Sequence, residues 1–282
     1  MYSTPHKLGY VRARGLNTRY LECGPRDAPT VILLHGTAGS LENFCRNYAA
    51  LGEHYRVIGI DMVGSGASEK PNVDCTISEY VEHVREVMAA LEVKDAFFIG
   101  VSLGSWIAVA LEQAHPGLVK KLIMIAPSGI VVDEEEYQKV LAGIRARRGG
   151  AAAAPTWDSI KAVLSKMVKY PEKLIDDLVA VRLDIYSRPS MKEAMPKLLA
   201  FMEDRPMTTE QWQKMTIPIL VIANVDVPNM FLDNARAIAK VAPNATSIDF
   251  KDVDHWCQYE RSDVFNRLAM DYFAGKVVPS TI

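Results

Sequence analysis

Three residue types along this chain could together hydrolyse a substrate: a serine, a carboxylate and a histidine. Residues 100–104 read GVSLG, a GxSxG motif with Ser102 at its centre, between an apolar run and a segment of helical period. Such a strand-to-helix turn holds the serine side chain above the sheet edge, and its glycines relieve crowding. A serine hydroxyl attacks poorly until a base takes its proton. The motif predicts Ser102 as a nucleophile; the alternative is a serine that only caps the following helix.

The acid and the base of such a site are expected to follow the serine along the chain. Asp226 comes just after the apolar run 217–222, where its carboxylate could accept a hydrogen bond from a histidine ring and fix its tautomer. His255 follows the strand-like run 246–250 and is predicted as the general base. The rival carboxylates are Asp233, Asp249, Asp252 and Asp254. Asp254 is the weaker choice because adjacent side chains in an extended loop diverge.

A small, glycine-rich loop, HGTAG at residues 35–39, could bind a developing oxyanion through backbone N–H groups. Thr37 is the first choice for the loop donor and Ala38 the second. The other donor would be Leu103, directly after the serine. His35 precedes the loop instead of following the acid, so we expect it to be a structural, hydrogen-bonded histidine.

These residues stand at the ends of elements that alternate in type. Continuous apolar runs, typical of buried parallel strands, occur at residues 30–34, 55–60, 96–99, 121–125 and 217–222. Segments of helical period occur at 76–91, 103–115, 232–241 and 261–273. Residues 10–14 and 19–23 look like an antiparallel hairpin at the sheet edge. The pattern predicts an α/β fold with a mostly parallel central sheet and helices on both faces.

The alternation breaks after Ala126, where helical pieces separated by prolines begin. We expect a helical cap at residues 129–215, inserted between two parts of the α/β core at 1–128 and 216–282. Residues 145–155, RARRGGAAAAP, combine a charge run with glycine and alanine. That composition predicts a solvated helix end and a mobile connector.

Composition narrows the class of protein. The chain has 282 residues, 49% of them hydrophobic, which suits one large domain with an inserted subdomain. Its 32 Lys and Arg against 34 Asp and Glu give a net charge of −2. No overall positive field would attract nucleic acid or an anionic membrane, so the expected partner is a small-molecule substrate.

The sequence shows no motif for metal binding, dinucleotide binding, secretion or membrane insertion. The four cysteines are scattered without a CxxC pair, and there is neither an HExxH motif nor a cluster of histidine and cysteine ligands. The Gly-Ser-Gly at 64–66 is too short for a dinucleotide fingerprint. No secretory signal stands at the N-terminus, and no apolar run approaches the roughly 20 residues that span a bilayer. We expect a cytoplasmic protein without metal or cofactor.

At these residues the chain resembles the α/β-hydrolase superfamily over essentially its whole length, with an inserted cap. More narrowly, HWCQYE at 255–260 followed by FNRL at 265–268 resembles the HWxQxE and FN segment of the meta-cleavage product hydrolases. NF and RN at 43–47 and the segment 181–188 resemble two further segments of that group. Its members hydrolyse a carbon–carbon bond in 2-hydroxy-6-oxo-hexa-2,4-dienoates.

The resemblance implies that Asn43, Arg182 and Trp256 contact the substrate, and that the protein is a homodimer or higher homo-oligomer. Arg182 would be a fixed cation in an apolar cap that holds a carboxylate or enolate in a bidentate clamp. The alternatives are a solvated Arg182, a Trp256 that packs beneath the cap and an Asn43 that caps a helix. Val101 departs from the group, which has asparagine there, as does the loop TAGS at 37–40.

Taken together, the sequence predicts a cofactor-independent serine hydrolase that cleaves a carbon–carbon bond of a meta-cleavage product. A carboxylesterase or lactonase with the same three residues is the alternative. A ligand-sensing protein that keeps the pocket but turns over slowly belongs to a different class, and intact Ser102, Asp226 and His255 argue against it.

Overall fold

A computed structural model describes residues 4–282 and shows one eight-stranded sheet in the order β1-β2-β4-β3-β5-β6-β7-β8. The strands are β1 (His6–Ala13), β2 (Leu16–Cys23), β3 (Thr30–Leu34), β4 (Arg56–Ile60), β5 (Ala96–Val101), β6 (Val119–Ile125), β7 (Ile219–Asn224) and β8 (Ala245–Phe250). From β4 to β8 every neighbouring pair is parallel, while β1 and β2 form the antiparallel edge. The predicted fold class is confirmed.

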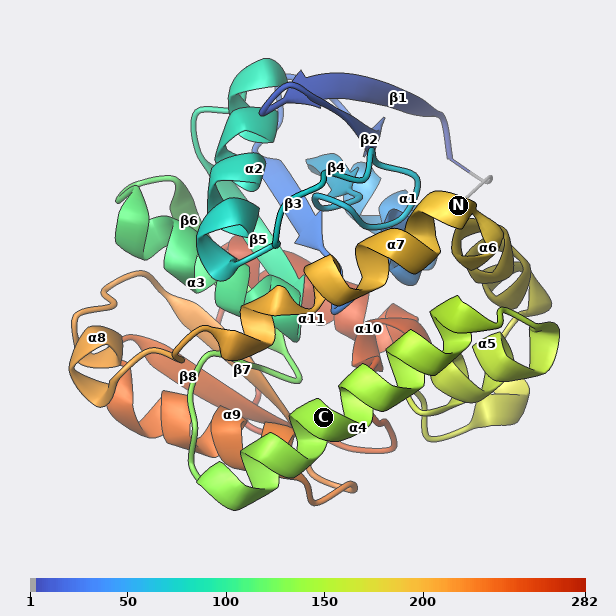
Figure 1. Ribbon diagram of the computed structural model, residues 1–282. Helices are drawn as coiled ribbons and strands as arrows, with labels where there is room; N and C mark the ends of the chain where they lie inside the picture. Colours follow the sequence, from blue (N-terminus) through green and yellow to red (C-terminus); the bar gives the residue numbers. More distant parts are fainter. Residues whose placement is uncertain (1–3) are drawn as a thin grey trace.

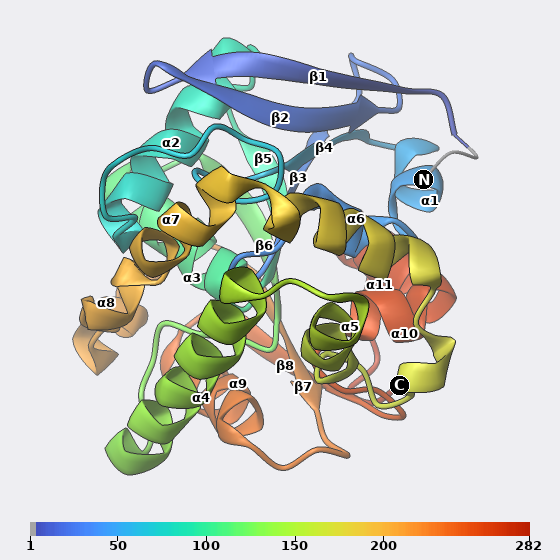
Figure 2. The ribbon, with the colours of Figure 1, turned by 45° about the vertical axis from the view of Figure 1, so that its right-hand side comes forward.

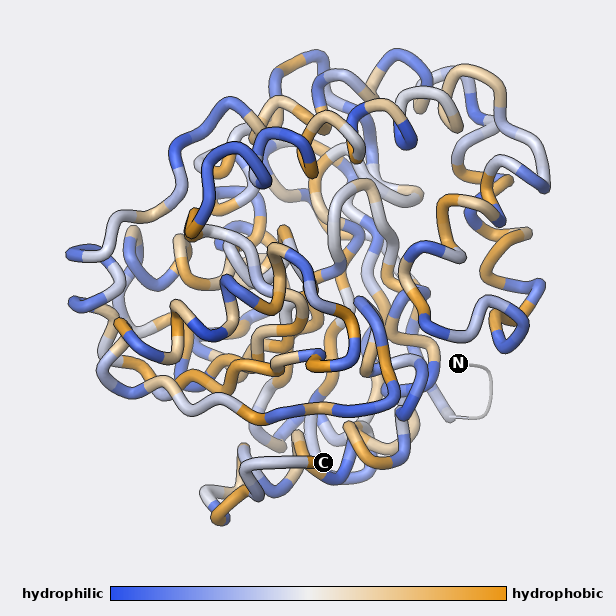
Figure 3. The backbone as a smooth tube through the Cα atoms, turned by 90° about the horizontal axis from the view of Figure 1, so that it is seen from below, coloured by the Kyte–Doolittle hydropathy of each residue, from blue (hydrophilic) through white to orange (hydrophobic). Residues whose placement is uncertain are grey.

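The parallel strands are buried on both sides because helices cover both faces of the sheet. In Figure 2, α2 and α3 lie on one side of the strands, and α1 and α11 lie on the other. The helices of this core are α1 (Tyr48–Gly52), α2 (Ile77–Ala90), α3 (Leu103–Ala114), α9 (Met230–Val241), α10 (Cys257–Glu260) and α11 (Ser262–Phe273), with the 3₁₀ turn η1 (Leu41–Phe44). Figure 3 shows apolar segments through the middle of the molecule and hydrophilic turns around it. Burial on both faces accounts for the continuous apolar runs.

The chain between β6 and β7 is helical. It contains α4 (Glu134–Ala153), α5 (Trp157–Ser165), η2 (Pro171–Lys173), α6 (Asp176–Ser187), α7 (Pro189–Leu198), η3 (Ala200–Glu203) and α8 (Thr209–Gln213). Figures 1 and 2 show α4, α5, α6 and α7 gathered on one side of the molecule. We call these four helices the cap; the boundaries 129–215 stay a prediction. None of the helices within residues 4–282 has the length and apolar character that a bilayer span requires.

The expectation of a mobile connector at residues 145–155 is wrong, because α4 runs unbroken from Glu134 to Ala153. The side chain of Asp133 caps its first turn. Three acidic residues in that turn stabilise the helix by interacting with the positive end of its dipole. Two glycines cost about 1 kcal/mol each relative to alanine, but the alanines around them are the best helix formers. Tertiary packing supplies the rest, since Ala151, Ala152 and Arg148 are buried.

A buried aspartate holds two loops at the sheet edge in place. The carboxylate of Asp61 accepts hydrogen bonds from the backbone N–H of Leu41 at 2.7 Å and of Ala67 at 2.7 Å. The Arg19 guanidinium lies 2.6 Å from the same carboxylate, which is fully buried. The glycine-rich turn after β4 is therefore scaffold.

Candidate active site

Ser102 occupies a strained turn between β5 and α3. Its backbone has φ 78° and ψ −109°, a conformation that costs a non-glycine residue about 1–3 kcal/mol. A Cβ atom at Gly100 would lie 2.6 Å from the carbonyl of Gly104, and one at Gly104 would overlap the carbonyl oxygen of Leu34. The two glycines of the motif thus permit the close approach of helix and strands that lifts Ser102 to the sheet edge.

Two backbone N–H groups beside Ser102 are free to bind an anion. Among residues 4–282, the N–H groups of Thr37 and Leu103 meet no hydrogen-bond acceptor. Ala38 has a positive φ of 48°, and its carbonyl accepts from Arg182 Nη1 at 2.9 Å and from the Tyr186 hydroxyl at 3.3 Å. Those bonds turn the Ala38 carbonyl toward the cap, a geometry that suits an oxyanion hole formed by Thr37 and Leu103.

His35 is structural, as expected. Its Nδ1 lies 2.7 Å from the carbonyl of Gly36, and its Nε2 lies 3.1 Å from the backbone N–H of Met62. The ring therefore donates from Nδ1 and accepts at Nε2. Burial lowers the pKa of His35 to about 3, so the imidazole stays neutral.

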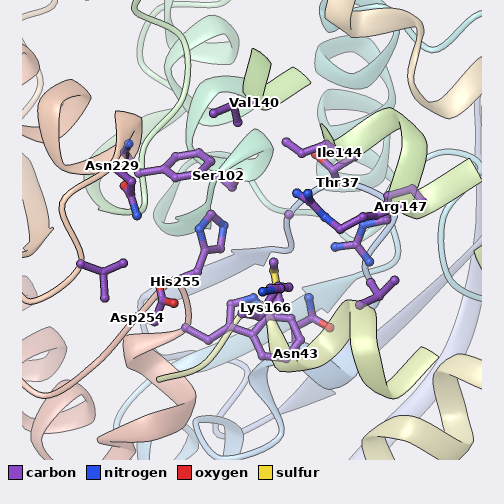
Figure 4. Close-up of a pocket in the computed structure, with 17 residues that line it drawn as sticks. Thr37, Asn43, Ser102, Val140, Ile144, Arg147, Lys166, Asn229, Asp254 and His255 are labelled. Carbon is purple, nitrogen blue, oxygen red and sulfur yellow. Dashed lines mark hydrogen bonds between the residues drawn. The ribbon is translucent and has the colours of Figure 1, made fainter. Parts of the chain in front are cut away.

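Ser102 and His255 line the same cavity, of about 300 Å³, beneath the cap. In Figure 4 the imidazole of His255 points toward Ser102 and away from the loop that carries Asp254. The ring packs edge-on against Phe231, with centroids 4.6 Å apart. Within residues 4–282 the imidazole forms no hydrogen bond, to Ser102 or to any carboxylate. Such bonds are often long before substrate binds.

The imidazole of His255 is neutral in the free protein. Burial lowers its pKa from 6.5 to about 4, and the nearby cation of Arg148 acts in the same direction. At neutral pH the ring is therefore uncharged and able to act as a base.

The structure does not bring Asp226 to His255. The Asp226 carboxylate lies 2.8 Å from the ammonium of Lys169 in the segment between α5 and η2, and it accepts a hydrogen bond from the backbone of Asp252 at 2.7 Å. These bonds lower its pKa, the Lys169 contribution being the larger. Asp254, the rival, lines the cavity beside His255. Burial raises the pKa of the Asp254 carboxyl.

Of the three expected substrate contacts, Asn43 and Trp256 line the cavity and Arg182 does not. Arg182 is 3% exposed, and its guanidinium donates to Ala38, to Ser40 and, at 2.9 Å, to the side chain of Asn43. The amide of Asn43 therefore serves no helix cap; it is held by the arginine behind it.

Sequence reasoning missed three cations on the cavity wall: Arg147, Arg148 and Lys166. Arg148 is buried, whereas Arg147 and Lys166 are exposed at the mouth. In Figure 4, Arg147 and Lys166 lie on the same side of the His255 ring as Asn43, opposite Asn229. The signal was the spacing of Val140, Ile144, Arg147 and Arg148, which places all four on one face of a helix.

Val101 stands directly before the nucleophile as a fully buried apolar side chain. Its Cγ1 would lie 3.7 Å from a Cβ atom at Gly36, so it packs against the oxyanion loop. It offers no hydrogen bond to a substrate in the cavity.

The chain is similar to known hydrolases over most of its length. It is 31% identical to a 2-hydroxy-6-oxononadienedioate/2-hydroxy-6-oxononatrienedioate hydrolase of Paraburkholderia xenovorans LB400, over 88% of this chain and 87% of the relative. A protein of Dechloromonas aromatica RCB with the same described activity is 30% identical over 91% of this chain and 90% of its own length.

Similarity extends to solved structures. A 2-hydroxy-6-oxo-6-phenylhexa-2,4-dienoate hydrolase from Rhodococcus sp. RHA1 superposes with a TM-score of 0.83 over 96% of this chain and 100% of its own. The two are 19% identical, so this likeness concerns the fold. The sequence profile described as the alpha/beta hydrolase fold matches residues 29–262. With its strand order, its serine turn and these similarities, the chain belongs to the alpha/beta hydrolase family.

Proposed function

We propose that this protein hydrolyses a carbon–carbon bond in a meta-cleavage product of the 2-hydroxy-6-oxo-hexa-2,4-dienoate type. The observation that carries the proposal is that Ser102, in its strained turn, and the neutral His255 line one cavity. The free N–H groups of Thr37 and Leu103 next to the serine support the same chemistry. The relatives from Paraburkholderia xenovorans and Dechloromonas aromatica, 31% and 30% identical over most of the chain, are named for such a reaction, and the segments around Asn43 and His255 resemble that group.

The reaction needs a proton relay and an oxyanion site. His255 moves a proton from the 2-hydroxyl of the dienol to carbon 5, which gives the keto form. Ser102, or a water that it orients, then adds to the distal carbonyl, and the oxyanion that forms is stabilised by Thr37 and Leu103. When the bond between carbons 5 and 6 breaks, its electron pair is taken up by the conjugated ketone as an enolate. Water completes the hydrolysis and leaves two carboxylic acids.

Asp226 completes the proposed triad by leaving Lys169 and accepting a hydrogen bond from the imidazole of His255. This exchange is local, because Asp226 lies in the exposed turn directly after β7 and Lys169 lies on the surface. Asn43 and Trp256 contact the substrate from the cavity wall. A homodimer or higher assembly stays a prediction, as does a cytoplasmic location.

A carboxylesterase or lactonase is the second candidate, and Val101 is the observation that favours it. The family segment has an asparagine here, whereas the buried Val101 cannot hydrogen-bond to a polarised dienoate. Ester and lactone hydrolysis use the same serine, base and oxyanion site without the initial tautomerisation.

Two assays on the purified protein test the proposal. A yellow 6-substituted 2-hydroxy-6-oxo-hexa-2,4-dienoate should be bleached with turnover, and faster than p-nitrophenyl butyrate is hydrolysed. The Ser102→Ala variant should lose at least about 10³-fold in kcat. Turnover of the ester alone would establish the second candidate, and undiminished turnover by Ser102→Ala would reject both.

A further inference from the structure

One face of α4 forms a wall of the cavity and changes character along its length. Val140, Ile144, Arg147 and Arg148 are spaced by four, three and one residues, so all four lie on one face of the helix. All four line the cavity that holds Ser102. The wall is therefore apolar toward the start of the helix and cationic toward its end.

Arg148 is a buried cation without a counterion. It is 7% exposed, and its side chain forms no hydrogen bond or ion pair with any of residues 4–282. Its Nη1 is shielded from water and has no acceptor. A buried, unpaired charge is costly, and the cost is removed when an anion with matching acceptors arrives.

The surroundings of Arg148 add positive charge. Arg147 and Lys166 stand at the mouth of the cavity, and within the described residues neither forms a salt bridge. Asp254 is the one carboxylate among the residues that line the described cavity, and it lies near Lys166. The field in this part of the cavity therefore favours an anionic ligand.

Arg182 is already committed elsewhere. Its two Nη groups hold the Ala38 carbonyl and the Asn43 amide, Nε alone has no acceptor within residues 4–282, and the residue does not line the cavity. A guanidinium whose paired N–H donors already bind the protein has few left for a ligand. The N–H donors of the Arg148 guanidinium bind no group in the described part of the chain.

We propose that Arg148, assisted at the mouth by Arg147 and Lys166, binds the carboxylate of the substrate, and that Arg182 is a positioning residue for Asn43 and the oxyanion loop. Identifying the bound group as the carboxylate of a dienoate substrate rests on the function proposed above. That Arg148 binds a conjugated carboxylate does not depend on that function. Arg148 has two acceptor-free edges for a bidentate contact with a planar carboxylate, and the mouth cations raise the rate at which anions enter.

Calorimetric titration with hexa-2,4-dienoate, and with its neutral amide, tests the site without any turnover. The wild-type protein should bind the anion more tightly than the amide. In Arg148→Met the affinity for the anion should fall by about 10- to 100-fold, with a far smaller change for the amide. Arg145→Met removes a cation of the same helix that pairs with the exposed Glu203, and it should leave both affinities unchanged.

Two further measurements separate a binding role from a structural one. Arg148→Met should not lower Tm without ligand, because it removes an uncompensated buried charge. Arg182→Met should weaken anion and amide alike and lower kcat, because it releases Asn43 and the loop. The proposal falls if Arg148→Met binds the anion as the wild type does, or if Arg182→Met alone abolishes the preference for the anion.

The same experiments distinguish this proposal from the proposed function. Binding of hexa-2,4-dienoate through Arg148 with no bleaching of any yellow dienoate would overturn the function and keep the site. Bleaching with an unchanged KM in Arg148→Met would keep the function and overturn the site.

Discussion

The ammonium of Lys169 lies 2.8 Å from the carboxylate of Asp226, and this ion pair joins the segment after α5 to the loop after β7. The same ammonium lies 3.2 Å from Asp252, which also accepts a hydrogen bond from the hydroxyl of Tyr170. Nearby, the backbone N–H of Trp256 donates to the carbonyl of Met167 at 2.9 Å. The segment from Met167 to Tyr170 therefore contacts both the predicted acid and the loop that carries the predicted base.

Replacing the predicted acid should be severe. We expect Asp226→Asn to lower kcat by about 10³- to 10⁴-fold, because an amide cannot stabilise the imidazolium of His255 and favours the wrong tautomer. Asp252→Asn is the matched control, since Asp252 shares Lys169 with Asp226, and it should change kcat by less than about 3-fold. Stopped-flow bleaching of the dienoate measures both. A greater loss in Asp254→Asn than in Asp226→Asn would assign the acid to Asp254 instead.

Removing the competing cation should free the acid. In Lys169→Met we expect the rate of the first turnover to rise a few-fold, because Asp226 no longer has to leave an ion pair to reach His255. The pair is exposed, so Tm should change little; such pairs contribute about 0–1 kcal/mol. Lys173→Met changes the same segment without touching Asp226 and serves as control. A tenfold slower first turnover in Lys169→Met, with Lys173→Met unchanged, would contradict this role.

The pH profile of kcat/KM should report the lowered pKa of His255, about 4 in the free protein. The base is the neutral imidazole, so activity should be flat from pH 8 to pH 5 and be lost as the pH falls through about 4. An unfolded histidine takes up its proton near pH 6.5, so the same depression makes the fold lose stability below about that pH. Rates are therefore divided by the folded fraction from tryptophan fluorescence.

Two results would bear on the cause of that profile. Arg148→Met should move the acid limb toward higher pH, since it removes a cation that disfavours the imidazolium. A midpoint at or above about 6.5 in the wild type would contradict an unpaired His255 in the ligand-free protein. It would indicate that Asp226 already pairs with the imidazole.

The strain at Ser102 should be measurable as stability. Both variants lose the hydroxyl, but only Ser102→Ala keeps a Cβ and therefore the strain. Glycine adopts a positive φ without penalty, so Ser102→Gly should be about 1 kcal/mol more stable than Ser102→Ala. Both variants should be inactive, and urea unfolding compares them. Equal stability of the two would mean that φ 78° is not strained in this turn.

Local sequence predicted those features of the protein that depend on the residues of one short segment. Continuous apolar runs predicted the parallel strands because a strand buried on both faces has no polar side. The glycines around Ser102 predicted the sharp turn because only a missing Cβ lets α3 approach β3 and β5 so closely. The position of His255 after the last strand followed from chain order.

Three features needed the tertiary structure. Residues 145–155 read as a connector, yet packing continues α4 through its glycines and buries Arg148 against the cavity. Arg182 was predicted as a substrate clamp, yet its two Nη groups donate to the Ala38 carbonyl and the Asn43 amide, both more than 130 residues away along the chain.

The partner of Asp226 is the third. Sequence places this carboxylate after β7 but leaves its rotamer open, and the choice between Lys169 and His255 depends on which charge the folded cap brings within reach. The sequence determines which side chains the protein has and in what order they follow along the chain. Which cation meets which carboxylate is decided by the fold, because electrostatic partners are chosen by distance in space, over a few ångströms, between segments that the chain itself keeps far apart.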